Sequence, residues 1–506
     1  MRMFFRVGKT KQRRQKQDDK SIETSVSTKL AENVKALNQR FASSPDLIIK
    51  ELQNSSGQKA ALVYLENLVD KTAINDQILR PLMIENAAFD PASIPIHKTS
   101  TTRAMDLIES SIFIGKSVLL VDGQPWAIIF NTQGWPQRSI KEPQIESTLK
   151  GGHQGLVETV GLNIALIRRY LPHRELMLTK TLVGERSQTT VFLLYLRDIC
   201  QPELVKELEN RIDRIKIDAL INAGELEEYL EDHWFTVFPQ FMQTERPDTI
   251  VSQLLQGRIV LIVDNSPVAL VGPMNFTSFF QNVDDYSLRW ILASFLRFIR
   301  FFSFLIAISL PAFYIATISF NYEILPIDLM ISIGISRERV PFPPLLEAFI
   351  MEVTIEMIRE AGVRLPSPIG QTIGVVGGIV IGQAAVQAGI VSNVMVIVVA
   401  LTAISSYIIP NYDMASAIRL IRFPLMIIAS MFGMVGIAIG MMILSIHIVT
   451  TTSLGYPYGS PIAPIRLPDW KDTWYRLPLW KMNKRPISAD PRQSMRQGHS
   501  RKSGKN

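Results

Sequence analysis

The chain has 506 residues, of which 47% are hydrophobic and 20% are charged, and its formal net charge is +7. This length predicts two or more domains, and the composition excludes a disordered, collagen-like or disulfide-stapled protein. Two long stretches, Leu365–Tyr412 and Phe423–Ile465, contain no Asp, Glu, Lys or Arg. Uncharged runs of 48 and 43 residues are longer than a soluble core needs, so we expect a membrane protein.

The positive charge is concentrated at the two ends of the chain. Residues 1–20 contain eight Lys or Arg and two Asp, and residues 466–506 contain eleven Lys or Arg and three Asp. Basic tails beside membrane spans favour the anionic cytoplasmic leaflet, so this charge predicts membrane lipid rather than nucleic acid as a partner. Met1 and the residues after it lack the apolar segment of a secretory signal, and we expect the N-terminal 290 residues to stay cytoplasmic.

Short apolar strands alternate with charged amphipathic helices between about Leu47 and Asp285, which is typical of an α/β region. Residues 117–130 predict a β-hairpin, because two β-branched, aliphatic runs flank the Asp-Gly turn at 122–123.

The hairpin pattern occurs twice. Residues 259–271 repeat its sequence pattern, and each copy follows a glycine and a basic residue. A second pair of similar segments, 62–68 and 193–199, stands in the same order relative to each hairpin. Two ordered matches favour duplication over a chance likeness of two hairpins. We therefore predict two related α/β subdomains followed by an α-helical transmembrane domain.

The predicted domain organisation follows these shifts in composition. It comprises a basic polar arm at 1–44, subdomain 1 at 45–140, a linker at 141–159, subdomain 2 at 160–290, a multi-span helical membrane domain at 291–450 and a basic tail at 451–506.

Four membrane spans are expected. One is Phe301–Asn321, two more lie in the first uncharged run with a tight turn near Gly389–Asn393, and Phe423–Val449 makes a further long one. Basic flanks at both chain ends place both ends inside, which requires an even number of spans.

Residues Pro344–Arg364 form an amphipathic segment between the spans. Glu352, Glu356 and Glu360 recur every four residues, which puts them on one helical face. We expect that face to be solvated.

No motif in the chain predicts catalysis. The sequence lacks the spacings of phosphate loops, hydrolase elbows and zinc proteases, and Cys200 is its only cysteine. The six histidines stand far apart. We therefore expect no enzyme activity, no catalytic residue, no cofactor and no metal.

Small and polar residues stand out within the spans. Two GxxxG pairs let helices approach closely in lipid, and two glutamines lie four residues apart on an otherwise apolar helix. The pairs are Gly378 with Gly382 and Gly436 with Gly440, and the glutamines are Gln383 and Gln387. These six residues are candidates for a pore lining or a helix seam. Either role would give the side-chain amides of the two glutamines hydrogen-bond partners.

Several strings give the chain a recognisable resemblance. It resembles the A subunit of the GerA-type spore germinant receptors of endospore-forming bacteria, over about Leu47 to Pro486. The strings are Phe238–Gln240, Thr244–Asp248, Pro341–Pro343, Glu347–Ala348, Arg359–Pro366 and Gly382–Ser392.

The resemblance implies a function that the residues alone do not. It implies a receptor subunit in the spore inner membrane, assembled with a permease-like B subunit and a lipoprotein C subunit, that triggers germination. It also implies a homo-oligomer with a ligand-gated ion-conducting path. The alternatives are a secondary transporter or permease for a small solute, and an A-like sporulation protein without a dedicated B subunit.

Overall fold

The computed structural model describes residues 25–42, 44–54, 57–83, 89, 99–134, 152–365 and 377–498. Residues 1–24 and 43 of the predicted arm and residues 141–151 of the predicted linker therefore lie outside the described residues. The chain divides into two compact units, Met1–Trp135 and Pro136–Asn506, and each is described by itself.

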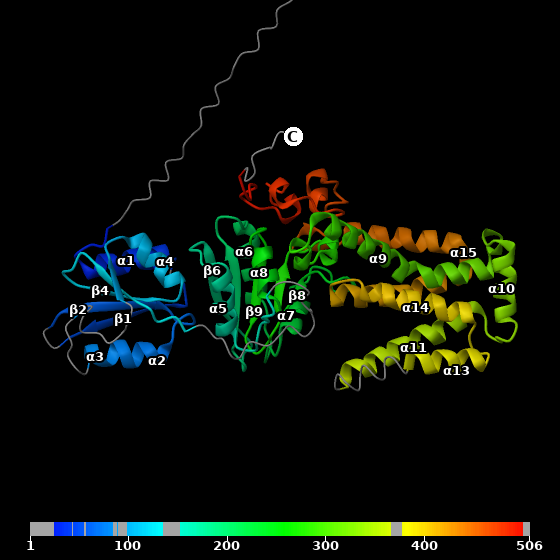
Figure 1. Cartoon of the computed structure of the whole chain (residues 1–506), viewed down its shortest axis with the longest axis horizontal. Helices are drawn as coiled ribbons and strands as arrows, with labels where there is room; N and C mark the ends of the chain where they lie inside the picture. Colours follow the sequence, from blue (N-terminus) through cyan, green and yellow to red (C-terminus); the bar gives the residue numbers. More distant parts are fainter. Residues whose placement is uncertain are drawn as a thin grey trace, which may run out of the picture. The chain divides into compact units, whose positions relative to one another are not determined.

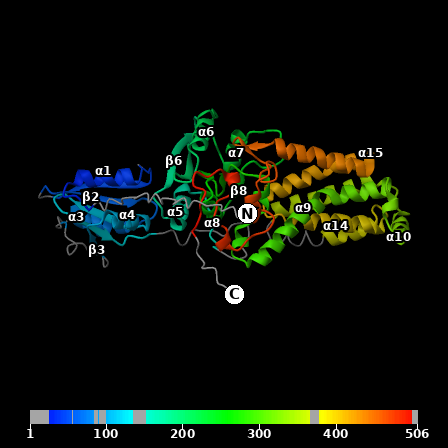
Figure 2. The ribbon, with the colours of Figure 1, turned by 90° about the horizontal axis from the view of Figure 1, so that it is seen from above.

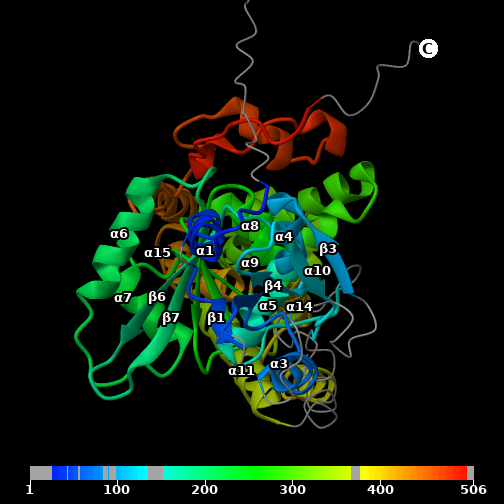
Figure 3. The same ribbon diagram turned by 90° about the vertical axis from the view of Figure 1, so that its left-hand side faces the viewer.

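The first unit is an antiparallel five-stranded sheet in the order β1-β2-β4-β5-β3. Helices α1 and α4 cover one face, and α2 and α3 cover the other (Figures 1 and 3). A π-helical stretch, Ile74–Leu79, joins α2 to α3. The elements are α1 (Leu30–Arg40), β1 (Leu47–Gln53), β2 (Lys59–Leu65), α2 (Lys71–Ala73), α3 (Arg80–Met83), β3 (Thr99–Thr102), α4 (Met105–Phe113), β4 (Ser117–Val121) and β5 (Ala127–Phe130).

The second unit begins with a sheet of the same topology, in the order β6-β7-β9-β10-β8. Its elements are α5 (Val160–Tyr170), β6 (Leu176–Val183), β7 (Thr189–Leu196), α6 (Pro202–Asp213), α7 (Ala223–Leu230), β8 (Met242–Thr244), α8 (Pro247–Leu254), β9 (Ile259–Val263) and β10 (Ala269–Gly272).

The central strand β9 is buried on both faces, because helices cover both sides of the sheet. Val260 and Ile262 belong to the core that includes Ile250 of α8. Leu261 and Val263 point the other way and join the core of α6 and α7. Successive side chains of a strand alternate between its two faces, so an unbroken aliphatic run fits this position.

The predicted duplication is confirmed by topology and register. Ser117 pairs with Phe130 in the first hairpin, and Ile259 pairs with Gly272 at the equivalent position of the second. The turns match as well, because Gly123 and Asn265 both adopt a left-handed backbone, with φ of 81° and 65°. Glycine and asparagine tolerate that conformation best.

A buried asparagine is repeated together with the sheets. The Asn33 amide donates to the Ser27 carbonyl at 2.6 Å and accepts from its N–H at 2.8 Å. Asn163 makes the same pair of bonds to Val157, at 2.6 and 2.8 Å. The folded repeats thus reach back to about residues 25 and 155, because each needs this segment and its first helix. The predicted boundaries at 45 and 160 are too late.

The rest of the second unit is dominated by long helices that run side by side, with α10 across their far end (Figures 1 and 2). Among the described residues, two helices are long and apolar enough to cross a membrane, α9 and α15. The helices are α9 (Trp290–Ser319), α10 (Ile327–Arg337), α11 (Pro344–Arg364), α13 (Gly382–Gln387), α14 (Asn393–Tyr407) and α15 (Tyr412–Thr450). The turn predicted near Gly389–Asn393 is confirmed, since Gly389 has a φ of 69° and α14 begins at Asn393.

Helix α15 is two helices that meet at Gly433, whose φ of 59° and ψ of −138° are not helical. A Cβ added at Gly436 would overlap the carbonyl oxygen of Ile428. In a straight helix, positions eight apart are separated by about 12 Å, so the chain must fold back. The predicted single span Phe423–Val449 is therefore a hairpin, with a first arm at 412–432 and a second arm at 434–450.

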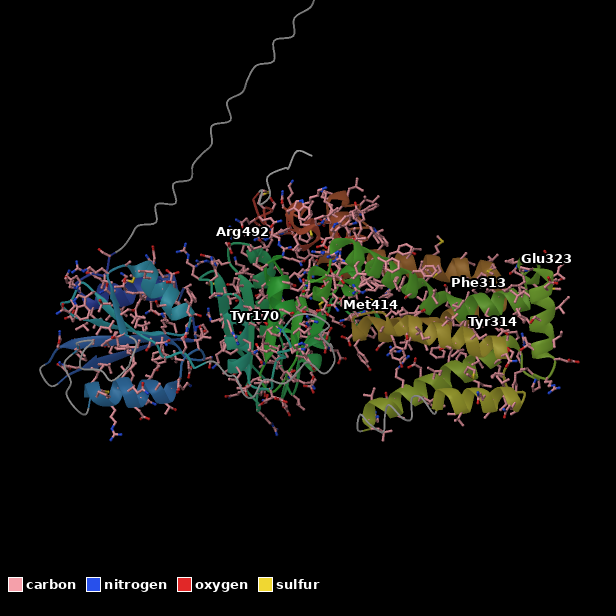
Figure 4. The ribbon with its side chains drawn as sticks, viewed as in Figure 1. Tyr170, Phe313, Tyr314, Glu323, Met414 and Arg492 are labelled. Carbon is pink, nitrogen blue, oxygen red and sulfur yellow. The ribbon has the colours of Figure 1, made fainter. Side chains whose placement is uncertain are left out.

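The stretch predicted as a basic tail is folded over residues 451–498. Tyr458 is fully buried, and its ring lies 6.3 Å from the ring of Phe276. The backbone N–H of Arg492, labelled in Figure 4, donates to the Ile199 carbonyl at 2.8 Å. The aromatic residues among its lysines and arginines explain this packing. Its elements are β11 (Thr452–Ser453), β12 (Tyr456–Pro457) and the 3-10 helices Leu467–Asp472, Leu479–Lys481 and Ile487–Ala489.

Candidate functional site

Helix α11 turns polar side chains inward and apolar side chains outward. Glu347 and Glu352 are 0% and 1% exposed, whereas Met357 and Val363 are 60% and 68% exposed. A soluble helix has the opposite arrangement. The expectation that Glu352 lies on a solvated face is wrong, because a basic residue from another helix meets it inside.

That basic residue is Arg422 of the first arm of α15. Its guanidinium forms a short ion pair with the Glu352 carboxylate, and Arg422 is 1% exposed. One turn further along α11, Glu356 lies 3.4 Å from Arg419 and 2.8 Å from Arg359. This ladder requires α11 and the first arm to run antiparallel.

The ladder has a signal in the sequence, which the expectation of a solvated carboxylate face overlooked. Arg419 and Arg422 stand three residues apart just before an apolar run, and Glu352 and Glu356 stand four apart on a helix. Both spacings place charges on one helical face, and the two faces are complementary.

Glu347 ties three further helices together. Its carboxylate accepts from the Ser392 N–H at 2.7 Å and from the Ser392 hydroxyl at 2.5 Å, which fixes the start of α14. The Ser392 hydroxyl also lies 3.2 Å from the hydroxyl of Tyr314 on α9, labelled in Figure 4. Arg337 of α10 approaches the carboxylate at 3.6 Å.

These charges are incompletely paired within the chain. Among the described residues, Nε and Nη2 of Arg422, Oε1 of Glu352 and Oε2 of Glu347 are buried and have no hydrogen-bond partner. Buried polar atoms normally bind protein groups, water or ions. The helical region therefore contains a polar layer inside an apolar exterior.

A cavity of about 510 Å³ lies where the second sheet meets the helices. Arg246, Arg300, Arg359 and Arg419 contribute to its lining, together with Asp284. Arg246 donates to Asp248 at 2.8 Å and to Asp284 at 3.0 Å. Burial lowers the pKa of Arg246, but the bonds to these two carboxylates outweigh it and raise that pKa above its usual range.

A second junction between sheet and helices is acidic. Burial raises the pKa of Glu227 on α7 to about 8, a bond from Gln243 at 2.6 Å opposes this, and repulsion from Asp413 of α15 adds to it. The half-buried carboxyl of Glu231 has its pKa raised to about 7, mainly by burial. Both carboxyls are therefore able to exchange protons near neutral pH.

The glutamines predicted from the sequence lie on α13. Gln383 and Gln387 are exposed in the single chain. Gly382, which precedes Gln383, is buried. A Cβ added at Gly382 would lie 3.8 Å from Val396 of α14. Gly378 is exposed, and an added Cβ would meet nothing within 4 Å. Gly382 therefore backs onto α14, while the amides face away from the chain.

The second GxxxG pair lies between the two arms of α15. Gly436 faces the Ile428 carbonyl, and a Cβ added at Gly440 would overlap the Leu425 side chain. Both glycines thus allow the arms to approach closely.

The fold thus defines a protein with two related α/β domains followed by a helical region that contains the long apolar helix α9 and the apolar hairpin of α15. Residues 35–488 match the family model described as the Bacillus/Clostridium GerA spore germination protein. The chain belongs to the GerA family of spore germination proteins, which confirms the resemblance noted from its sequence strings.

Several relatives are similar over nearly the whole chain. Spore germination protein KA of Bacillus subtilis (strain 168) is 38% identical over 492 residues, covering 95% of this chain and 90% of that protein. Spore germination protein B1 of the same organism is 39% identical over 481 residues, covering 93% and 99%. The uncharacterized membrane protein YfkQ of that organism is 38% identical over 468 residues, covering 91% of each.

One solved structure is also similar. It is the N-terminal domain of the A subunit of the Bacillus megaterium spore germinant receptor GerK3, which is 28% identical, with a TM-score of 0.39. The match covers 50% of this chain and 97% of that one.

Proposed function

We propose that this chain is the membrane subunit of a nutrient germinant receptor in the spore inner membrane, and that it oligomerises to form a ligand-gated ion-conducting path. Its membership of a spore germination family supports the role in germination. The receptor assignment rests on the resemblance of its sequence strings to the A subunits of germinant receptors. A permease-like B subunit and a lipoprotein C subunit are the proposed partners.

The observation that carries the membrane placement is the inverted character of the helical region. Large apolar side chains of α15 such as Met431, Val435 and Met442 are 60%, 65% and 65% exposed. Glu347 and Glu352 are buried at the same time. Hydrocarbon stabilises this arrangement, and water does not.

The proposed ion path is formed between copies of the chain. Gln383 and Gln387 lie on the outer face of α13, so an oligomer brings one set of amides from each copy together. Amide oxygens replace part of a cation's hydration shell without trapping it as a ring of carboxylates does. The duplicated α/β region is proposed to lie on the spore-core side.

Cation flux from liposomes tests this proposal. The purified full chain is reconstituted alone and with its B and C partners, and potassium release is followed after nutrient addition. We expect release only from the complete complex. Liposomes without protein serve as the negative control. Nutrient-triggered solute uptake without ion release contradicts the ion path and favours the transporter alternative.

A further inference from the structure

A second, apolar groove of about 760 Å³ lies at the beginning of α9. Trp290, Leu292 and Phe295 of α9 form one wall, and Leu479 and Trp480 of the folded C-terminal segment form the other. Two arginines, Arg289 and Arg476, also line it. The groove is therefore apolar along its walls and cationic in two places.

Arg476 is a buried cation that the chain itself leaves partly unpartnered. It is 3% exposed, its Nη1 donates to the Leu288 carbonyl at 3.0 Å, and its buried Nε has no hydrogen-bond partner among the described residues. Burial lowers the pKa of Arg476 and the positive charge of Arg297 acts in the same direction, and together they outweigh the opposing effect of Tyr286, Asp472 and Asp285. A bound anion would compensate this charge.

The carboxylates nearby are already shared among other arginines. Asp285 lies 3.0 Å from Arg297 and 2.8 Å from Arg300, and Asp472 lies 2.8 Å from Arg297. Arg476 feels the charge of both carboxylates but makes no ion pair with either among the described residues, so three guanidinium groups face two carboxylates. The exposed Arg289 adds a further positive charge, so this end of α9 carries an excess of cations.

The start of α9 adds backbone donors to the same place. Arg289 is the N-cap residue, and its side chain makes no capping bond. The N–H groups of a helix's first turn lack partners within the helix and favour anions.

An apolar stripe connects the groove to the membrane-length part of α9. Ile291, Phe295, Phe298, Phe302 and Leu305 recur at intervals of four and three residues, and all are exposed, from 47% to 65%. The 30 residues of α9 extend for about 45 Å, which matches the bilayer including its headgroup layers rather than the hydrocarbon alone. The groove then lies at headgroup depth, where tryptophans are enriched.

We propose that this groove is a binding site for an anionic glycerophospholipid, whose phosphate contacts Arg289 and Arg476 and whose acyl chain follows the stripe into the bilayer. The site rests on the membrane placement proposed above and not on the ion path. A phospholipid fits better than a second protein chain, because it supplies an anion and a hydrocarbon chain at the two ends of one continuous surface.

Native mass spectrometry of the full chain tests the site. The chain is purified in detergent and exposed to phosphatidylglycerol or to phosphatidylcholine with identical acyl chains, and retained lipid is counted. We expect preferential retention of phosphatidylglycerol. Arg289→Gln, at an exposed position, should weaken it about fivefold, the effect of one basic residue near a membrane surface. Lys471→Gln removes the same charge from an exposed position outside the groove and should leave retention unchanged.

Leu292→Trp fills the groove and should reduce retention of both lipids. Equal retention of the two lipids by the wild-type chain, or equal effects of Arg289→Gln and Lys471→Gln, would overturn the site. Displacement of the lipid by inorganic phosphate alone would show a free-anion site instead. Unchanged lipid retention with an altered oligomer mass for Leu292→Trp would overturn the lipid site and assign the groove to a second copy of the chain. Failure of the chain to insert into liposomes would contradict the membrane placement separately.

Discussion

Glu352 of α11 and Arg422 of α15 form an ion pair in which each residue is only 1% exposed. Desolvating two such charges is costly, so the pair adds little net stability compared with an apolar contact. Its value lies in specificity. A slip of α11 along the first arm of α15 would separate both carboxylates from their arginines and leave charges buried alone.

Replacing one member of this pair should therefore destabilise the folded chain more than replacing both members. Arg422→Met leaves the Glu352 carboxylate unpaired and should cost about 3–5 kcal/mol, which predicts poor accumulation in the membrane. The double variant Glu352→Leu with Arg422→Met should recover most of the loss. Accumulation and detergent melting temperature measure this. Arg364→Met, which breaks an exposed pair with Glu360, is the matched control and should cost at most about 1 kcal/mol. Normal accumulation of Arg422→Met would show that the pair is not buried.

Substitution of Gln383 and Gln387 distinguishes a pore role of α13 from a packing role. In spores that carry Gln383→Leu or Gln387→Leu, we expect normal protein levels and a strong loss of cation release after nutrient addition, because an apolar ring does not hydrate a passing cation. Immunoblotting and potassium measurements test this. Release at the wild-type rate with normal protein levels contradicts the pore role, and loss of the protein would point to a helix seam.

Gly433 should not tolerate a side chain. Its φ of 59° favours glycine, and an added Cβ would lie 2.9 Å from Cβ of Phe320. We expect Gly433→Ala to destabilise the α15 hairpin by at least about 1–2 kcal/mol, from backbone strain alone. Gly378→Ala, where the added carbon meets open space, should be neutral. The comparison uses melting temperatures of the two purified variants, and equal values would exclude a tight turn at Gly433.

The acidic junction predicts a pH dependence with a definite sign. The pKa of Glu227 is raised from 4.5 to about 8, mainly by burial, so the folded state keeps a proton that the unfolded chain has lost. The contribution of this proton to the free energy of unfolding is fully present below about pH 4.5 and is lost as pH rises toward about 8. Glu227→Gln should therefore flatten the fall in melting temperature between pH 5 and about pH 8.

Glu228→Gln is the control for this measurement, because Glu228 is exposed on the same helix. Its melting temperature should follow the wild-type pH profile. A Glu227→Gln profile as steep as that of the wild type would show that Glu227 ionises normally in the folded chain.

Local and contiguous patterns in the sequence predicted several features correctly. The hairpin at 117–130 and its copy at 259–271 are readable because a strand, a turn and a second strand follow one another within a few residues. The turn before Asn393 is readable for the same reason. The beginnings of the repeats are not readable in this way, because Asn33 and Asn163 make their defining bonds to residues that lie six positions earlier and outside any strand.

The sequence by itself determined the two repeated sheets, the apolar character of the helical region and the membership of its family, since each depends on patterns within a segment. Only the tertiary structure decided that Glu352 lies inside against Arg422, that α15 folds back at Gly433, and that residues 451–498 pack on the second sheet. Each of these depends on which segments meet in space. The spacing of carboxylates along a helix is the same whether they bind water or pair with an arginine 70 residues away in the sequence. Whether Glu352 is buried therefore depends on the arginine that packs against it in the folded chain.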